Sequence, residues 1–266
     1  MTSLYLIYSI FSFLMGAVIA SFLNVVIWRV PRGESIVSPP SHCPKCNARI
    51  KWYQNIPILS YLALRGRCAN CRDKISPRYL IVETIGGLLF FAAFRSFGLC
   101  APVMWLWFSL LIVGTMIDFD HKLLPDFVTV GGMLLGVAAS FLYYTPIWHY
   151  GSLPVVTPLW SVIGLAFGFG LMYLVRFFGS KAFKREAMGL GDVFLMGAVG
   201  AISGPIGVLM VLIFSSFLGS VIGVAALAIS HTRLTRGIEI PYGPYIAGAH
   251  LIVIFYGPEI LHWYLH

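Results

Sequence analysis

The sequence predicts an all-α polytopic membrane protein of about eight transmembrane helices with a small cytoplasmic loop module. Three observations predict this fold class. Of the 266 residues, 59% are hydrophobic and 11% are charged, whereas a soluble domain carries about 25% charged residues. Apolar runs close to the length that crosses a bilayer recur along the chain. The net charge of +8 is concentrated in one polar segment. This composition excludes a soluble enzyme, a DNA-binding domain and a disordered chain.

Apolar runs mark the candidate transmembrane helices. They cover residues 3–28, 80–99, 102–117, 127–144, 158–178, 192–204, 206–230 and 246–264. The first run has no basic residue before it and contains polar residues near its end, so we interpret it as a retained helix and not as a cleaved signal peptide. The sixth run is short and ends at Ser203-Gly204-Pro205, which indicates a half-span or a helix turned tightly into the seventh.

The polar segment follows the first run. Residues 29–78 hold ten Lys and Arg and two acids, so this segment alone accounts for the net charge of the protein. A basic segment between apolar helices is typical of a cytoplasmic loop, and its charge favours anionic lipid headgroups. We prefer this interpretation to nucleic-acid binding. The predicted parts are a first transmembrane helix (1–28), a basic cytoplasmic loop (29–79) and a seven-helix membrane domain (80–266).

The remaining loops support one orientation. If the basic loop is cytoplasmic, alternation places both termini outside and three further loops inside. These inside loops are 118–126, 179–191 and 231–245, and each of them carries Lys or Arg. The predicted outside loop at 145–157 carries neither, as the positive-inside rule requires.

Four of the five cysteines form two C-x-x-C pairs separated by 21 residues, namely Cys43, Cys46, Cys68 and Cys71. Two pairs at this spacing are typical of a tetrahedral thiolate site for zinc, and a metal would stabilise a loop too small for its own core. Disulfides or a redox pair are alternatives that a reducing cytoplasm disfavours. Four protein ligands leave no open position, so we expect a structural, zinc-knuckle-like module. Cys100 is interpreted as an ordinary apolar residue.

Carboxylates at the ends of membrane helices are candidate functional residues, because charge is costly in a bilayer. Asp118 ends a predicted helix, where a negative charge opposes the helix dipole and capping does not explain it. Asp192 follows Gly189 and Gly191 in a G-x-G-D sequence. N-capping is an alternative role for Asp192, but the glycines indicate a close backbone approach. For Asp126, N-capping is the preferred explanation.

Asp118 and Asp192 could hydrolyse a peptide bond if they meet at the cytoplasmic face. Two close carboxylates share one proton. The ionised one takes a proton from water, while the protonated one polarises the peptide carbonyl and protonates the leaving amine. The chain has no G-x-S-x-G or H-E-x-x-H motif for another hydrolytic mechanism. A proton or ion transporter would place its acids near mid-membrane, and a non-catalytic assembly protein would leave Asp118 unexplained.

In this order the motifs resemble the bifunctional prepilin peptidases, the leader peptidases and N-methyltransferases of type IV pilus and type II secretion systems. The resemblance covers nearly the whole chain. Its further elements are Gly16 to Trp28, Asn55-Ile56-Pro57, Leu64 to Cys68, Ile75 to Tyr79 with Val82-Glu83, and Ile240 to Tyr245. The G-x-G-D sequence is also similar to that of presenilin-like intramembrane proteases.

The resemblance implies a multi-pass protein of the bacterial inner membrane that cleaves type IV prepilins or type II secretion pseudopilins. Cleavage after a glycine at the cytoplasmic face would be followed by methylation of the new N-terminal residue with S-adenosylmethionine. The catalytic residues would be Asp118 and Asp192, with Gly189 and Gly191 in support, and the four paired cysteines would hold the metal. A peptidase with little methyltransferase activity is an alternative.

Two positions leave questions open. No glycine-rich loop of a Rossmann-type methyltransferase is present, and Glu83 is one candidate for the S-adenosylmethionine site, with an ion pair to Arg78 as the alternative. The family commonly has Lys two residues after the second aspartate, where this chain has Phe194. A nearby cation favours an ionised carboxylate, so Phe194 affects the electrostatics of the pair and not the reaction class. Lys122 or Arg185 could supply the missing charge.

Overall fold

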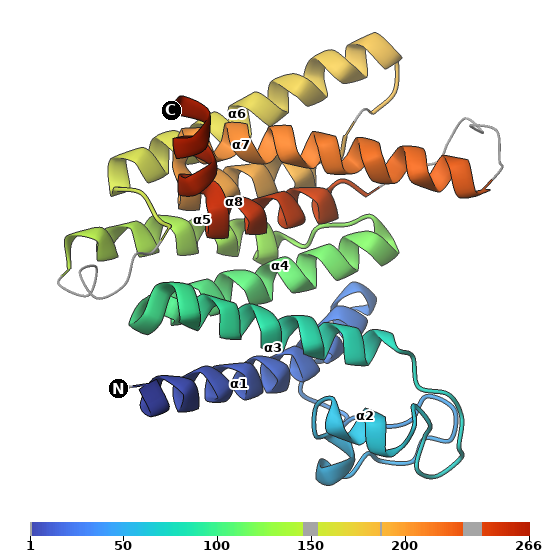
Figure 1. Cartoon of the computed structure of the whole chain (residues 1–266). Helices are drawn as coiled ribbons and strands as arrows, with labels where there is room; N and C mark the ends of the chain where they lie inside the picture. The colour runs from blue at the N-terminus through green and yellow to red at the C-terminus, as the bar shows by residue number, and fades with distance from the viewer. Residues whose placement is uncertain (1, 146–153, 187, 231–240) are drawn as a thin grey trace. The chain divides into compact units, whose positions relative to one another are not determined.

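The computed structural model describes residues 2–145, 154–186, 188–230 and 241–266, which are predominantly helical (Figure 1). The α-helices are α1 (Thr2–Arg29), α2 (Leu59–Ala63), α3 (Arg78–Phe97), α4 (Ala101–His121), α5 (Asp126–Ser140), α6 (Pro158–Phe183), α7 (Leu190–Ser230) and α8 (Gly243–Leu265). The 3-10 helices are η1 (Val30–Arg32), η2 (Trp52–Asn55), η3 (Gly98–Cys100) and η4 (Phe141–Tyr144). Within the described ranges, β structure is limited to two isolated bridges. The predicted all-α class is confirmed.

Six segments of the described chain are long and apolar enough to cross a membrane. They are Leu4–Arg32, Arg78–His121, Asp126–Tyr144, Pro158–Phe183, Leu190–Ala225 and Gly243–Tyr264. A polytopic membrane protein is therefore confirmed, while the count of about eight helices stays a prediction. Arg233 and Arg236 of a predicted inside loop, and residues 146–153 of the predicted outside loop, lie outside the described residues. The chain divides into two compact units, 1–113 and 114–266.

In the first unit, α1 packs closely on α3 through small residues. A Cβ placed on Gly16 would lie 2.5 Å from the Gly86 carbonyl oxygen, and one placed on Gly86 would collide with the Ala20 side chain. Small residues of this kind let helix backbones approach one another where lipid provides no hydrophobic driving force. The contact therefore fixes α1 against α3, the two helices between which the basic loop runs.

The long apolar segment that begins at α3 folds back on itself before α4. Gly98 ends α3 with φ 54° and ψ −125°. The rings of Phe90 and Trp105 stack with centroids 5.1 Å apart, and Trp105 Nε1 donates to the Phe90 carbonyl at 3.0 Å. A straight helix would separate residues fifteen positions apart by about 22 Å. The segment thus contains two helices, as the sequence predicts.

In the second unit, α7 also reverses direction. Gly204 interrupts it with φ 68° and ψ −175°. A Cβ placed on Gly168 of α6 would touch both the Met196 carbonyl and, at 3.1 Å, the Val208 side chain. A straight helix would separate these two α7 residues by about 18 Å. The chain therefore turns back at Gly204, which agrees with one of the two interpretations of the short sixth run.

The first half of α7 is held between α5 and α6. Ser161 on α6 donates its hydroxyl to the Ala201 carbonyl at 2.6 Å, and a Cβ on Gly164 would collide with the Gly200 carbonyl. On the α5 side, a Cβ on Gly136 would lie 2.8 Å from the Ala201 side chain. Because both neighbours touch the α7 backbone directly, the first half of α7 is fixed within the second unit.

Candidate active site and cysteine cluster

Asp118 lies in the last turn of α4 and meets the first residue of α8. Its side chain is only 6% exposed. The backbone N–H of Gly243 donates to Asp118 Oδ2 at 3.0 Å. A Cβ on Gly243 would lie 2.6 Å from that same oxygen, so only glycine leaves room for this contact. A backbone N–H that donates to a carboxylate forms a charge-assisted hydrogen bond, which is short and strong.

Asp192 lies in the first turn of α7, as the third residue of that helix. It is therefore not the N-cap, which was the alternative role considered from the sequence. Its side chain is 8% exposed, and among the described residues its Oδ1 has no hydrogen-bond partner. A buried carboxylate oxygen without a partner is costly unless a water or a substrate group occupies the site.

Leu124 links the surroundings of the two aspartates. Its Cδ1 lies 3.3 Å from a Cβ placed on Gly191, the residue before Asp192, and 3.4 Å from a Cβ placed on Gly243. The backbones beside the two aspartates therefore both pack against one methyl group. Asp118 Oδ2 accepts from the Gly243 N–H and Asp192 directly follows Gly191, so each carboxylate lies beside a residue that packs on Leu124. The second unit thus brings both predicted carboxylates together where α4 ends and where α7 and α8 begin.

The other residues singled out in this region have different surroundings. A Cβ on Gly189 would lie 3.6 Å from Asp192 Oδ2, an ordinary contact distance. Phe194 packs edge-on against Phe169 of α6, with ring centroids 5.3 Å apart. Asp126 is the first residue of α5 and Pro125 is its N-cap, so the predicted N-capping role of Asp126 is wrong. Its carboxylate instead stands in the first turn, where it complements the helix dipole.

The four paired cysteines form one cluster in the basic loop. All four Sγ atoms lie within 4.8 Å of one another, and Cys43 Sγ is 3.8 Å from Cys71 Sγ. A tetrahedron with metal–sulfur bonds of about 2.3 Å has edges of about 3.8 Å. The donor set and its spacing therefore fit a tetrahedral metal ion, and the predicted grouping of the four cysteines is present.

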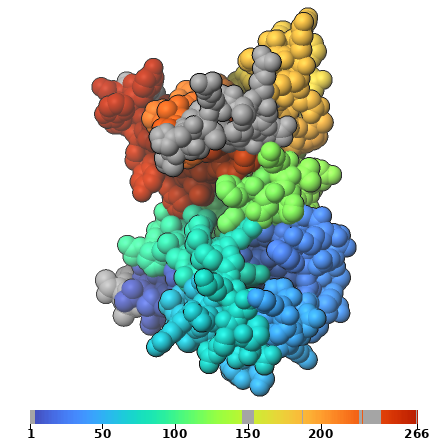
Figure 2. Space-filling model, turned by 90° about the vertical axis from the view of Figure 1, so that its right-hand side faces the viewer, coloured from blue at the N-terminus to red at the C-terminus, as the bar shows by residue number. Residues whose placement is uncertain are grey.

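The two C-x-x-C turns have the same local design. Each is closed by an isolated antiparallel bridge, His42 with Arg49 and Arg67 with Lys74. In each turn the residue four positions after the first cysteine has a positive φ, 55° at Asn47 and 60° at Arg72. Left-handed conformations of this kind let the backbone fold tightly around a metal site. Figure 2 shows the loop, in light blue to cyan, as a packed body.

Hydrogen bonds and charges support the cluster from outside. The Asn70 side chain donates to Cys46 Sγ at 3.5 Å, and this contact is the largest cause that lowers the pKa of the Cys46 thiol to about 6. A lowered pKa favours the thiolate that metal binding requires. Lys45 of the first turn pairs with Asp73 of the second at 2.9 Å. Their hydrogen bond raises the pKa of Lys45 and lowers that of Asp73.

Glu83 connects the basic loop to α3. Its side chain is buried, and Oε2 accepts the backbone N–H of Ile58 at 2.8 Å. Ile58 has φ 62° and ψ −54°, and Leu59 N–H bonds to the Pro57 carbonyl at 2.5 Å. This is a γ-turn, a strained conformation for a β-branched residue. Glu83 thus holds a strained turn of the loop.

Two partners of the aspartates were not identified as site residues from the sequence. Gly243 belongs to a motif of the family resemblance, and nothing in its neighbours along the chain indicates that it donates to Asp118. Leu124 has the apolar character that most residues of this chain share. Both act through tertiary contacts, so periodicity and spacing carry no signal for them.

The comparisons with known proteins agree with this arrangement. The model of the bacterial Peptidase A24 N-terminal domain matches residues 14–97, and that of the type IV leader peptidase family matches residues 105–224. A type 4 prepilin-like proteins leader peptide-processing enzyme of Escherichia coli O78:H11 is 33% identical, over 90% of this chain and 91% of that protein. The chain belongs to the type IV leader peptidase family.

Other relatives extend this family assignment. A prepilin leader peptidase/N-methyltransferase of Myxococcus xanthus is 42% identical over 83% of this chain, and the match spans 64% of that relative's length. One of Pseudomonas aeruginosa is 31% identical, over 95% of this chain and 91% of that protein. No solved structure matches the chain. The family's two matched segments divide near the boundary of the two units, so the N-terminal domain falls in the first and most of the peptidase segment in the second.

Proposed function

We propose that this protein cleaves the leader peptide of type IV prepilins or type II secretion pseudopilins, and then methylates the new N-terminus. The observation that carries the proposal is the convergence of two buried carboxylates, Asp118 and Asp192, from different helices. Relatives named as prepilin leader peptidase/N-methyltransferases support both activities. The six apolar segments and the family support a multi-pass protein of the bacterial inner membrane, and we place its active site at the cytoplasmic face.

The surroundings of the aspartates suggest separate roles in hydrolysis. Asp118 accepts the Gly243 N–H, a bond that stabilises an ionised carboxylate, so Asp118 takes a proton from the attacking water. Asp192, whose Oδ1 has no hydrogen-bond partner in the described part of the chain, holds the shared proton and donates it to the scissile carbonyl. Water oxygen bonds to the carbonyl carbon, the C–N bond then breaks, and the proton gained by Asp118 passes to the leaving amine. Asp192 recovers its own proton as the new carboxyl group forms, so both aspartates end as they began.

The methyltransferase reaction needs a donor from solution. When bound, S-adenosylmethionine supplies an electrophilic methyl group, which the N-terminal amine takes with loss of a proton while S-adenosylhomocysteine is released. We assign zinc to the cysteine cluster. Four thiolates fill a tetrahedral zinc ion and leave no position for substrate, so the metal holds the loop together and takes no part in either reaction.

The test is a cleavage assay with the full-length protein in detergent and a type IV prepilin as substrate. We expect wild type to remove the leader and both Asp118→Asn and Asp192→Asn to be inactive while keeping the wild-type thermal midpoint. Asp126→Asn is the matched control, because this exposed carboxylate also lies at a helix end and should leave cleavage unchanged. Full cleavage by both aspartate variants would overturn the aspartyl mechanism. Adding labelled S-adenosylmethionine to the same reaction tests the second activity.

A further inference from the structure

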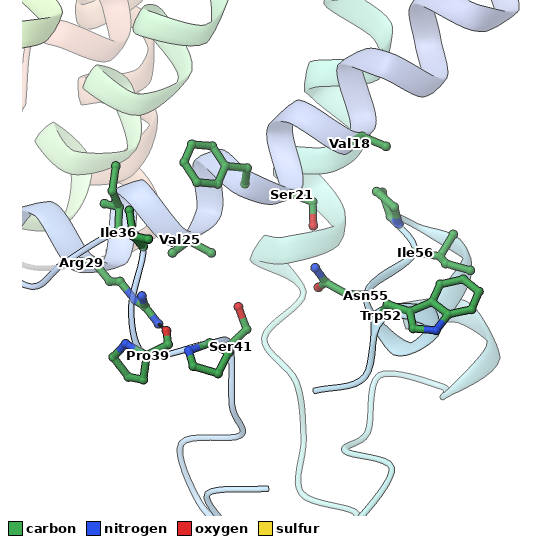
Figure 3. A pocket seen from close by; sticks show the side chains of 14 residues that line it. Val18, Ser21, Val25, Arg29, Ile36, Pro39, Ser41, Trp52, Asn55 and Ile56 are labelled. Carbon is green, nitrogen blue, oxygen red and sulfur yellow. Dashed lines mark hydrogen bonds between the residues drawn. The ribbon is translucent and has the colours of Figure 1, made fainter. Parts of the chain in front are cut away.

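The first unit contains a cavity of about 490 Å³ beside the end of α1. Its walls are the face of α1 from Val18 to Arg29 and two segments of the basic loop, 36–41 and 52–57. Figure 3 shows Ser21 on α1 facing Asn55, while Arg29 at the end of α1 points to the segment that carries Pro39. Small-molecule sites have volumes of about 300 to 1,000 Å³ and combine apolar walls with a few polar groups. This cavity has both properties, and neither of the two proposed reactions assigns a role to it.

A buried cation lies at one end of the cavity. Arg29 is 7% exposed, and its guanidinium donates to the carbonyl oxygens of Ser35 at 2.8 Å and Pro39 at 2.7 Å. No carboxylate pairs with Arg29 among the described residues. A guanidinium has five N–H donors, and burying its charge without a counter-ion is costly. The unbalanced charge therefore points to an anionic group on a ligand.

The other end of the cavity offers an aromatic surface. The Trp52 side chain is 81% exposed although it lines the cavity, and in Figure 3 it lies away from Arg29, with Ser21 and Asn55 between them. An exposed indole face stacks well on a planar base. Arg29 is the one charged side chain in the lining, so the ligand carries a single small anionic group. A nucleoside triphosphate, with several negative charges, does not fit this charge balance.

Glu83 fixes the wall that carries Asn55 and Trp52. The strained turn at Ile58 follows directly after the lining residues Asn55 to Pro57, and its N–H is bound by the buried Glu83 carboxylate. Strained backbone persists where the surrounding structure holds it in place, and such positions cluster at ligand sites. Glu83 is therefore a positioning residue of the cavity wall and lies outside the lining itself.

We infer that this cavity binds S-adenosylmethionine, with its carboxylate on Arg29 and its adenine ring on Trp52. The inference rests on the proposed methyltransferase function and gives that function a site in the first unit. The carboxylate and the purine ring of the donor complement the cation and the aromatic surface at the two ends of the cavity, and its ammonium and sulfonium groups lie between these ends. The polar side chains of Ser21 and Asn55 lie between these ends, beside the middle of the bound molecule. A lipid phosphate is the other anion that could meet Arg29 at a membrane surface.

The test measures binding of labelled S-adenosylmethionine by equilibrium dialysis of the full-length protein in lipid nanodiscs. Loss of a hydrogen bond to a charged group weakens binding by about 10- to 100-fold, which we expect for Arg29→Gln. Loss of base stacking predicts a decrease of about 5- to 100-fold for Trp52→Ala. Arg32→Gln and Trp28→Ala are the matched controls, because these residues stack on each other outside the cavity lining, and they should bind as wild type does.

The outcomes separate the cavity from the function. Wild-type affinity in both Arg29→Gln and Trp52→Ala would overturn the cavity assignment and leave the methyltransferase function in place. If wild type did not bind the donor in a sample that cleaves prepilin, both the cavity assignment and the methyltransferase function would be overturned. S-adenosylhomocysteine should displace the label and short-chain phosphatidylglycerol should not, and displacement by the lipid would identify a phosphate site instead. Because Trp52 is exposed, its variant keeps the test valid if Arg29→Gln does not fold.

Discussion

Replacing Gly243 with alanine should impair leader cleavage without unfolding the protein. The new Cβ would lie 2.6 Å from Asp118 Oδ2, whereas ordinary contact begins near 3.4 Å. The carboxylate must therefore retreat by about 0.8 Å, which breaks its 3.0 Å bond to the Gly243 N–H. The backbone of Gly243 has no positive φ, so alanine itself fits the local conformation. The steric effect thus falls on the aspartate and not on the helix.

The size of the effect follows from the lost hydrogen bond. A bond to a charged group contributes about 1.5 to 3 kcal/mol, which corresponds to a decrease of about 10- to 150-fold in the cleavage rate constant. A displacement near 1 Å in an active site has a similar cost. We expect the decrease in kcat, measured with a prepilin substrate under single-turnover and steady-state conditions, with little change in KM because the added methyl group displaces the Asp118 carboxylate.

Gly248→Ala is the matched control on the same helix. Among the residues that the structure describes, a Cβ at Gly248 meets only the Leu218 side chain, at 3.9 Å, so this variant should cleave as wild type does. It should also be slightly more stable, because alanine in a helix interior is favoured over glycine by about 0.5 to 1 kcal/mol. If Gly243→Ala cleaved at the wild-type rate, the contact between Gly243 and Asp118 could not be what positions the catalytic carboxylate.

Three further predictions follow from contacts in the two units. Gly191→Ala should lower cleavage strongly, because its Cβ would lie 2.7 Å from a neighbouring Cβ, whereas Gly189→Ala should be nearly silent; equal losses in a cleavage assay would contradict this. Purified wild type should contain one zinc ion per chain by mass spectrometry, lost in Cys71→Ser and kept in Cys100→Ser, and full metal content in Cys71→Ser would disprove a four-cysteine site. Glu83→Ala should lower the free energy of unfolding of the first unit by about 1.5 to 3 kcal/mol. Glu83→Gln should lower it by less, because the amide oxygen still accepts the bond from the Ile58 N–H. Scanning fluorimetry that ranks the two variants in the opposite order would exclude the proposed contact.

Several features of the fold could be predicted because they depend on local sequence. A long apolar run in lipid must satisfy its backbone hydrogen bonds internally, and a helix does so within one segment. The reversal at Gly204 has a local sign in the Ser-Gly-Pro sequence that ends the sixth run. Helix ends were less certain. Asp126 was expected to cap α5, yet the preceding Pro125 takes that position, because a cap depends on backbone conformation as well as on side-chain chemistry.

Partners far apart in the chain could not be predicted in this way. Glu83 was compared with Arg78, its neighbour along the helix, and the structure also gives it the N–H of Ile58, 25 residues away. The cavity likewise joins the end of α1 to a loop segment more than twenty residues later, so Arg29 had no distinguishing feature within its basic surroundings. Both cases involve backbone groups as partners, and such groups carry no residue-specific signal.

By itself the sequence determined that this protein lies in lipid, that its fold is all-α and which residues are candidates for its chemistry. Its apolar runs require lipid, and the spacing of its cysteines places four thiolates in two short turns, because both properties belong to the chain over a few residues. Only the tertiary structure decided that Asp118 and Asp192 meet. Their meeting depends on the contact between Gly191 and Leu124, six residues after Asp118, because a side chain at position 191 would lie 2.7 Å from the Leu124 Cβ. It also depends on Gly243, which reaches Asp118 across 125 residues through a backbone N–H.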